Sequence, residues 1–202
     1  MSANSADLPD IDKAELRRLQ VLDAAAACFR LAGFHAASMA SIAKAAGMSV
    51  GHIYHYFANK EAIISAIIDR EQHKQLQVIH MLLRAENTIE ALIEHAEQGL
   101  ADSLDLSNSA LNFEMIAEAS RNPKVAEMLQ ASNRVLHEFG KDIITKARVD
   151  LPALSEEDNN ARCDLIISLF DGLSMRAISN PRLNTQAVLP ALQRTIVQIV
   201  RS

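Results

Sequence analysis

Residues 38–61 carry the pattern that most constrains the fold of this chain, two short amphipathic segments on either side of Gly47. In the first segment, Ile42 and Ala46 lie four residues apart, so they share one face of a helix. Ser38 is a favourable N-cap for that helix, and glycine is the residue type that most readily ends a helix in the left-handed region. The pattern predicts a helix-turn-helix.

The second segment, residues 50–57, is predicted to form a helix with one buried and one exposed face. Ile53 and Phe57 are four residues apart and are expected to face the core. His52 and His55 then lie on the opposite face, where imidazole nitrogens can reach the edges of bases in a DNA groove.

The two tyrosines of the chain, Tyr54 and Tyr56, fall on the flanks of the same helix. Phenolic hydroxyls can donate to phosphate oxygens, so the tyrosines would position the helix while the histidines read bases. The alternative is a helical corner whose polar face is only solvated. The residues expected to contact DNA are Ser38, Met39, Ser49, Val50, Gly51, His52, Tyr54, His55, Tyr56 and Lys60.

Charge is distributed unevenly along the chain, whose formal net charge is −5. Residues 13–60 hold six basic and two acidic side chains, whereas residues 61–202 hold 14 basic and 20 acidic ones. This asymmetry is typical of a DNA-binding protein, because an acidic body repels DNA from the wrong face. A chance fluctuation in composition is the alternative.

A longer pattern extends over about residues 14–62. A first helix with alanines and a phenylalanine is followed by a Gly-Phe break, a capped helix, the run Ala-Gly-x-Ser-x-Gly-x-Ile-Tyr-x-Tyr-Phe, and Lys-Glu. In this pattern the chain resembles the TetR/AcrR family of bacterial transcriptional regulators. The residues that carry the resemblance are Ala25, Ala26, Phe29, Gly33, Phe34, Ser38, Ile42, Ala43, Ala46, Gly47, Ser49, Gly51, Ile53, Tyr54, Tyr56, Phe57, Lys60 and Glu61.

The resemblance implies a helix-turn-helix DNA-binding domain over residues 1–60 and a helical domain over residues 61–202 that dimerises and binds a ligand. It therefore predicts a homodimeric repressor that binds a pseudo-palindromic, double-stranded operator and is released by a small-molecule inducer. The alternative is a DNA-binding protein of the same fold that senses no small ligand, or that acts as an activator or a DNA-organising adaptor.

The chain is predicted to be all-α, because its strong patterns have a helical period and it contains only 6 glycines and 5 prolines. The helix that starts at Lys60 is expected to run continuously from the N-terminal headpiece into the larger domain. Nine helices are expected, at about residues 11–32, 39–46, 50–57, 60–83, 88–104, 106–121, 123–149, 155–179 and 185–201.

The sequence excludes two other classes, membrane-spanning proteins and proteins with a signal peptide. No run approaches the roughly eighteen apolar residues that span a bilayer. The first residues are acidic, unlike the basic start of a signal peptide, so a cytoplasmic protein is expected. Cys28 and Cys163 lack metal-ligand spacing and are expected to be buried, reduced thiols.

Patterns for catalysis and metal binding are absent from the sequence. It contains no His-Glu-x-x-His, no glycine-rich phosphate loop and no nucleophile elbow. His73 and His80 could share a face with His95 or His137, but the expected cysteine or carboxylate partners are missing. We therefore expect no enzyme activity, no metal and no cofactor.

An inducer would require a cavity lined mostly by apolar side chains. The alternative is that the candidate residues belong to an ordinary core. The candidates are Met81, Phe113, Glu114, Ile116, Ala117, Met128, Phe139 and Phe170, with Glu118 or His137 as further polar contacts.

Residues 161–179 and 185–200 carry apolar faces that could pair with their symmetry mates in a four-helix bundle. Glycine within a helix costs about 1 kcal/mol relative to alanine, and close approach of another helix would explain Gly172. The expected interface residues are Leu165, Leu169, Gly172, Leu173, Leu189, Leu192 and Ile196.

Overall fold

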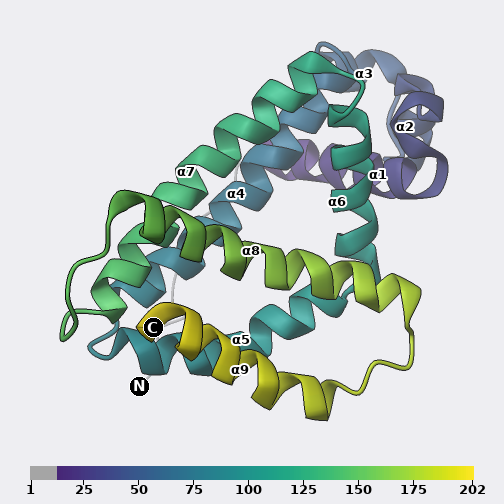
Figure 1. Ribbon diagram of the computed structural model, residues 1–202. Helices are drawn as coiled ribbons and strands as arrows, with labels where there is room; N and C mark the ends of the chain where they lie inside the picture. Colours follow the sequence, from purple (N-terminus) through teal and green to yellow (C-terminus); the bar gives the residue numbers. More distant parts are fainter. Residues whose placement is uncertain (1–12) are drawn as a thin grey trace, which may run out of the picture. The chain divides into compact units, whose positions relative to one another are not determined.

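A computed structural model describes residues 13–202, in which the regular elements are nine helices (Figure 1). The predicted all-α class is therefore confirmed. The expected start of the first helix, at residue 11, lies outside the described residues. The chain forms two compact units that divide between Ile67 and Ile68.

The N-terminal unit contains α1 (Lys13–Ala36), α2 (Met39–Ala45), α3 (Val50–Tyr56) and the first turns of α4 (Lys60–Arg84). The backbone of Gly33 interrupts α1, with φ 75° and ψ 162°. Glycine adopts a positive φ without a steric penalty. The predicted break at Gly33 is thus present, and helical geometry resumes after it.

The core of the N-terminal unit uses the apolar residues predicted to face inward. Ile42, Ala46, Ile53 and Phe57 are all buried, because their spacing of four places each pair on the same side of its helix. Ile63, Ile64 and Ile67 of α4 are buried as well. The compact unit consequently extends past residue 60, where the boundary of the DNA-binding domain was predicted.

The C-terminal unit contains the remainder of α4 and five further helices. These are α5 (Thr88–Leu104), α6 (Leu106–Ala119), α7 (Pro123–Ala147), α8 (Glu156–Ser179) and α9 (Thr185–Arg201). Side chains of Asn87, Asp105, Asn122, Ser155 and Asn184 accept hydrogen bonds from backbone N–H groups in the first turns. These caps explain why the helix starts were predictable.

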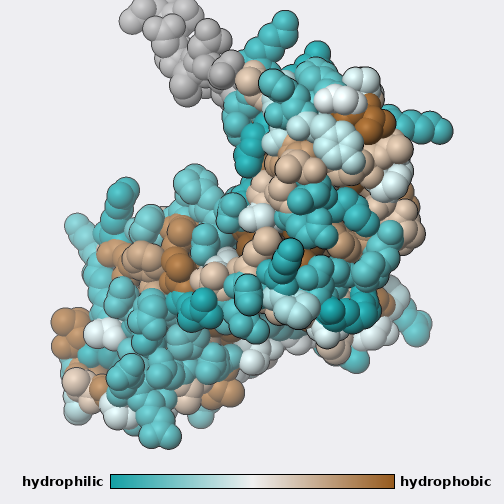
Figure 2. Space-filling model, turned by 90° about the horizontal axis from the view of Figure 1, so that it is seen from above, coloured by the Kyte–Doolittle hydropathy of each residue, from teal (hydrophilic) through white to brown (hydrophobic). Residues whose placement is uncertain are grey.

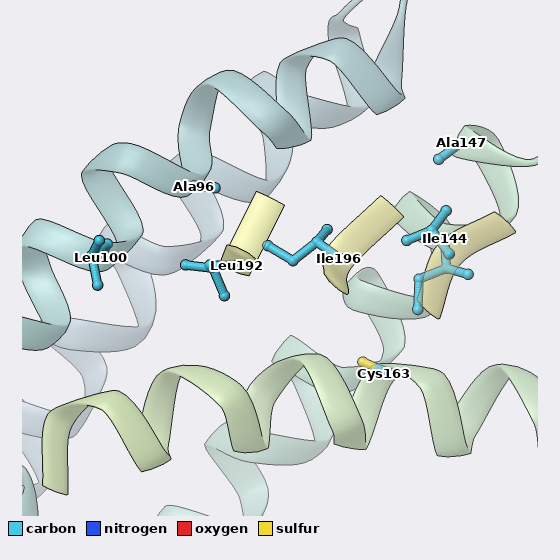
Figure 3. Packing of buried hydrophobic residues seen from close by; sticks show 8 residues of the cluster. Ala96, Leu100, Ile144, Ala147, Cys163, Leu192 and Ile196 are labelled. Atoms are coloured by element: carbon cyan, nitrogen blue, oxygen red, sulfur yellow. The ribbon is translucent and has the colours of Figure 1, made fainter. Parts of the chain in front are cut away.

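Four helices, α5, α7, α8 and α9, contribute to the core of the C-terminal unit. In Figure 3, Leu192 and Ile196 of α9 lie between Ala96 and Leu100 of α5, Ile144 of α7 and Cys163 of α8. α5 and α9 lie side by side over most of their length (Figure 1). The apolar face of α9 is therefore directed into its own chain.

Long cationic side chains bind carbonyl oxygens near the ends of helices in this unit. Arg148, which is buried, donates from one guanidinium nitrogen to the carbonyl oxygens of Val200, at 2.6 Å, and Ser202, at 2.9 Å. Lys146 of α7 donates to Leu83, at 2.5 Å, and Ala85, at 2.8 Å. The last carbonyls of a helix lack intrahelical partners, and a cation also interacts favourably with the helix dipole.

Among residues 13–202, no helix is both long enough and apolar enough to cross a membrane. The face seen in Figure 2 is mostly hydrophilic, with hydrophobic side chains in separate patches.

Candidate nucleic-acid interface

Ser38 and Ser41 define the start of α2 by a reciprocal pair of hydrogen bonds. The hydroxyl oxygen of Ser38 accepts from the backbone N–H of Ser41 at 3.0 Å, and that of Ser41 accepts from the N–H of Ser38 at 2.8 Å. This capping box satisfies two N–H groups that a helix leaves free. The role of Ser38 seen in the structure is thus to cap α2.

The turn between α2 and α3 requires glycine at position 47, where φ is 63°. Ser49 then caps α3 by accepting from the backbone N–H of His52 at 3.2 Å. Gln20 of α1 donates from Nε2 to the carbonyl oxygen of Ala46 at 2.7 Å. Sequence reasoning missed Gln20, because local periodicity gives no signal for a contact between residues 26 positions apart.

α3 presents most of its side chains away from the core. Ile53 is buried, whereas His52, Tyr54 and His55 are exposed. Val50 and Gly51 are exposed too, and a methyl group on Gly51 would have no atom within 4 Å. The structure thereby brings the predicted residues of α3 together at one surface that is available to a partner.

The aromatic rings of α3 form a small cluster centred on Tyr56. The rings of His52 and Tyr56 lie 5.3 Å apart at 42°, and the hydroxyl of Tyr56 is 3.4 Å from Nε2 of His52. His55 meets the other side of Tyr56 edge-on, again with 5.3 Å between ring centres. Tyr56 is half-buried, so it is less accessible than Tyr54.

Lys60 has partners within its own unit, which changes the role predicted for it. Its ammonium group donates to the carbonyl oxygens of Phe34, at 2.7 Å, and His35, at 3.3 Å. It also lies 4.5 Å from the centre of the Phe34 ring. The structure thus shows Lys60 as an anchor between α1 and α4, because α1 ends with free carbonyl groups within its reach.

Comparison with known proteins identifies both parts of the chain. The family model described as bacterial regulatory proteins, tetR family, matches residues 21–67, and that of the tetracyclin repressor-like C-terminal domain matches residues 83–201. The second match alone spans more than half of the chain. The chain belongs to the TetR family.

Several TetR-family relatives are named as regulators. The HTH-type transcriptional regulator UidR of Escherichia coli K12 is 34% identical over 127 residues, which are 63% of this chain and 64% of UidR. The chain thus spans slightly less than two thirds of the length of this curated relative. The HTH-type transcriptional regulator BetI of Yersinia pestis is 27% identical over 200 residues, 95% of this chain and 96% of BetI.

A solved structure has a similar fold over nearly the whole length. Salmonella enterica GusR matches with a TM-score of 0.79 and 28% identity, covering 95% of this chain and 99% of GusR. The fold of this chain is therefore shared with GusR over nearly the whole length of both chains.

The residues of this TetR-family chain that were predicted to bind a ligand do not all line one cavity. Met81 and Ile116 are surface residues, 51% and 56% exposed, because Leu82 and Met115 beside them take the buried positions. These two assignments are wrong for a closed cavity within one chain. Phe113, Glu114, Ala117, Met128 and Phe139 are half-buried.

Three other ligand-binding candidates, Phe170, Glu118 and His137, already have contacts within the C-terminal unit. A Cβ on Gly99 would lie 2.8 Å from the ring of Phe170, so Phe170 packs directly on the backbone of α5. Glu118 is buried and accepts from the side chain of Asn122 at 3.0 Å. His137 lies 3.1 Å from the carboxylate of Asp164. An open groove of about 420 Å³ lies elsewhere, lined by Ile93, Pro190, Gln193, Arg194, Val197 and Gln198.

The residues predicted to form the dimer interface fall into two groups, one packed in or against the core and one exposed. Leu192 and Ile196 are buried in the core of the unit, and Leu169, Leu173 and Leu189 pack against that core. Assigning Leu192 and Ile196 to an intermolecular surface is therefore wrong, because α5 already covers them. Leu165 is 55% exposed, and Gly172 has open space around the position of a Cβ.

Proposed function

We propose that this TetR-family chain is a homodimeric transcriptional regulator that binds a pseudo-palindromic operator through α3. The exposed His52, Tyr54 and His55, on a helix whose opposite face is buried, are the observation that carries the proposal. His52 and His55 would contact base edges in the major groove, and Tyr54 would donate to phosphate. The relatives named HTH-type transcriptional regulators support this assignment. Action on chromosomal DNA implies a cytoplasmic location.

The other predicted DNA contacts divide by their position. Val50, Gly51 and Ser49 lie at the start of α3, where a groove-binding helix contacts DNA with its N-terminal residues. Ser38 and Met39 at the start of α2 remain proposed phosphate contacts, with residues 1–60 as the DNA-binding domain. Lys60 is left out of this set, because its ammonium binds the end of α1.

The proposed dimer forms through the exposed side of α8. Leu165, Gly172 and Met175 are seven and three residues apart, so they share a face of the helix. Leu165 and Met175 are exposed apolar side chains, and Gly172 leaves room for a partner helix to approach. Burial of such a stripe against its symmetry mate would form a two-fold interface.

The proposed function includes release of the operator by a small-molecule inducer, bound within residues 61–202. α4 is suited to carry the signal, because it starts in one unit and ends in the other. Lys60 bonds its first turn to α1, and Lys146 bonds its end to α7. A ligand that favours one position of α4 would change the spacing of the recognition helices.

A DNA selection experiment tests this function. The purified protein is used to enrich binding sequences from a random double-stranded pool at moderate salt. We expect two inverted half-sites, about one helical turn or a multiple of it apart. His52→Ala should broaden the enriched sequence, whereas His73→Ala, an exposed histidine on α4, should leave it unchanged. Failure to enrich any sequence would overturn the proposal.

A further inference from the structure

We infer that Tyr56 determines which nitrogen of His52 carries the proton, and so which chemical edge of a base His52 reads. The inference rests on the proposed function of α3. It follows from the contact between the Tyr56 hydroxyl and Nε2 of His52, at 3.4 Å, with the two rings 5.3 Å apart. Residues four apart on a helix are neighbours, so the backbone of α3 maintains this pairing.

The direction of the hydrogen bond follows from the chemistry of the two groups. A neutral imidazole has one N–H donor and one acceptor nitrogen, whereas a phenol is both a donor and an acceptor. The phenolic O–H is the more acidic donor and the imidazole nitrogen the more basic acceptor, so Tyr56 donates to Nε2. The proton of neutral His52 is therefore on Nδ1.

This tautomer restricts what His52 can recognise. Nδ1–H can donate to the N7 or O6 of guanine, the N7 of adenine or the O4 of thymine. It cannot accept from the amino groups of adenine or cytosine. Tyr56 thus acts as a positioning residue, because it makes His52 donate to hydrogen-bond acceptors on base edges. This role replaces the phosphate contact predicted for Tyr56 from the sequence.

Within residues 13–202, the side chains of His52 and Tyr56 form no ion pair and no hydrogen bond other than the one between them. On α3, His55 contacts Tyr56 from the other side, ring to ring. On the adjoining elements, Arg18 of α1 lies 5.3 Å from the centre of the Phe57 ring, and Lys60 of α4 binds the carbonyl groups of Phe34 and His35. Lys44 lies in the last turn of α2 and is exposed.

The arrangement has a spectroscopic signature that a purely structural role of Tyr56 would lack. Without the hydroxyl, neutral His52 can place its proton on either nitrogen and lose selectivity.

Tyr56→Phe tests the inference, because it keeps the ring and removes the hydroxyl. Binding is measured to the enriched operator and to operators altered at the base pair where His52→Ala relaxes selection. At pH 8 we expect discrimination by Tyr56→Phe to fall roughly fivefold relative to the wild type, the effect of about one hydrogen bond.

Tyr54→Phe is the matched control, since it removes the other hydroxyl of α3. It should weaken binding to all operators by the same factor. The same uniform loss for Tyr56→Phe would show a phosphate contact and overturn the inference. Unchanged discrimination by Tyr56→Phe would overturn it as well.

Nitrogen NMR of the imidazole provides a test that does not depend on DNA. In the free protein at pH 8, His52 should show a protonated Nδ1 in the wild type and a mixture of tautomers in Tyr56→Phe. A wild-type mixture would overturn the inference even if operator binding is selective. Absence of selective binding by the wild type would instead overturn the proposed function.

Discussion

The ammonium nitrogen of Lys60 lies 2.7 Å from the carbonyl oxygen of Phe34 and 4.5 Å from the centre of the Phe34 ring. A single side chain thereby connects the first residue of α4 to the last turn of α1. The carbonyl supplies a hydrogen-bond acceptor, and the ring face attracts the cation. The connection bears on stability and on DNA binding, which can be measured separately.

Lys60→Met keeps most of the apolar stem and removes the charge and the donors. We expect the free energy of unfolding to fall by about 1 to 2 kcal/mol, measured by urea denaturation. Operator affinity should weaken by the same factor at every salt concentration. A phosphate contact would instead lower the salt slope by about one, which would return Lys60 to the DNA interface. Lys44→Met, at an exposed site on α2, is the control for stability.

Leu165 lies on the outside of the C-terminal unit, whereas Leu192 lies in its core. Leu165→Glu, at a site that is 55% exposed, should yield a folded monomer, because the charge disrupts only the proposed dimer face. Leu192→Glu, at a site that is 5% exposed, should destabilise the protein by about 3 kcal/mol or more. Sedimentation velocity and circular dichroism separate these results. If the Leu165→Glu variant remained a dimer with full operator affinity, the dimer would have to form through another surface.

Coupling between inducer and operator must be reciprocal. An inducer that weakens operator binding by a given factor is itself bound more weakly, by that factor, when the operator is present. We expect a factor of about 5 to 150. Calorimetry with and without operator, on any hit from a panel of apolar and cationic metabolites, measures it. Equal ligand affinities would contradict induction, and a panel without any binder would favour a member that senses no ligand.

The two cysteines should differ in reactivity. Burial raises the pKa of the Cys163 thiol to about 11, with a further contribution from the negative charge of Asp164. Since the thiolate is the reactive form, Cys163 should label slowly at pH 8 and about tenfold faster for each pH unit until its pKa is approached. Cys28 is only partly buried and should label first.

Absorbance with a thiol-exchange reagent gives the number of fast thiols per chain. Cys28→Ser should remove the fast phase from the native protein, and denaturant should expose Cys163. A fast native phase that persists in Cys28→Ser would show that Cys163 is accessible.

Local features of the sequence were sufficient for the positions of the helices. Capping residues such as Asn87 and Ser155 mark helix starts. The side chain of each accepts a hydrogen bond from the backbone N–H three residues later in the chain. The helix ends at Ala119 and Ala147 come before the predicted ends at 121 and 149. In the first case Asn122 and Pro123 already begin the next helix, so the chain must turn earlier.

Residue spacing within single helices was enough to predict the all-α class, the inward faces of α2 and α3, and the exposure of His52 and His55. The tertiary structure alone decided which apolar residues remain available to a partner. Leu165 and Leu192 belong to similar helical patterns, but α5 covers Leu192 and leaves Leu165 exposed. Contacts such as Gln193 with Ile93, 100 residues apart, bring α5 and α9 together, and helical periodicity carries no information about which helix lies beside another.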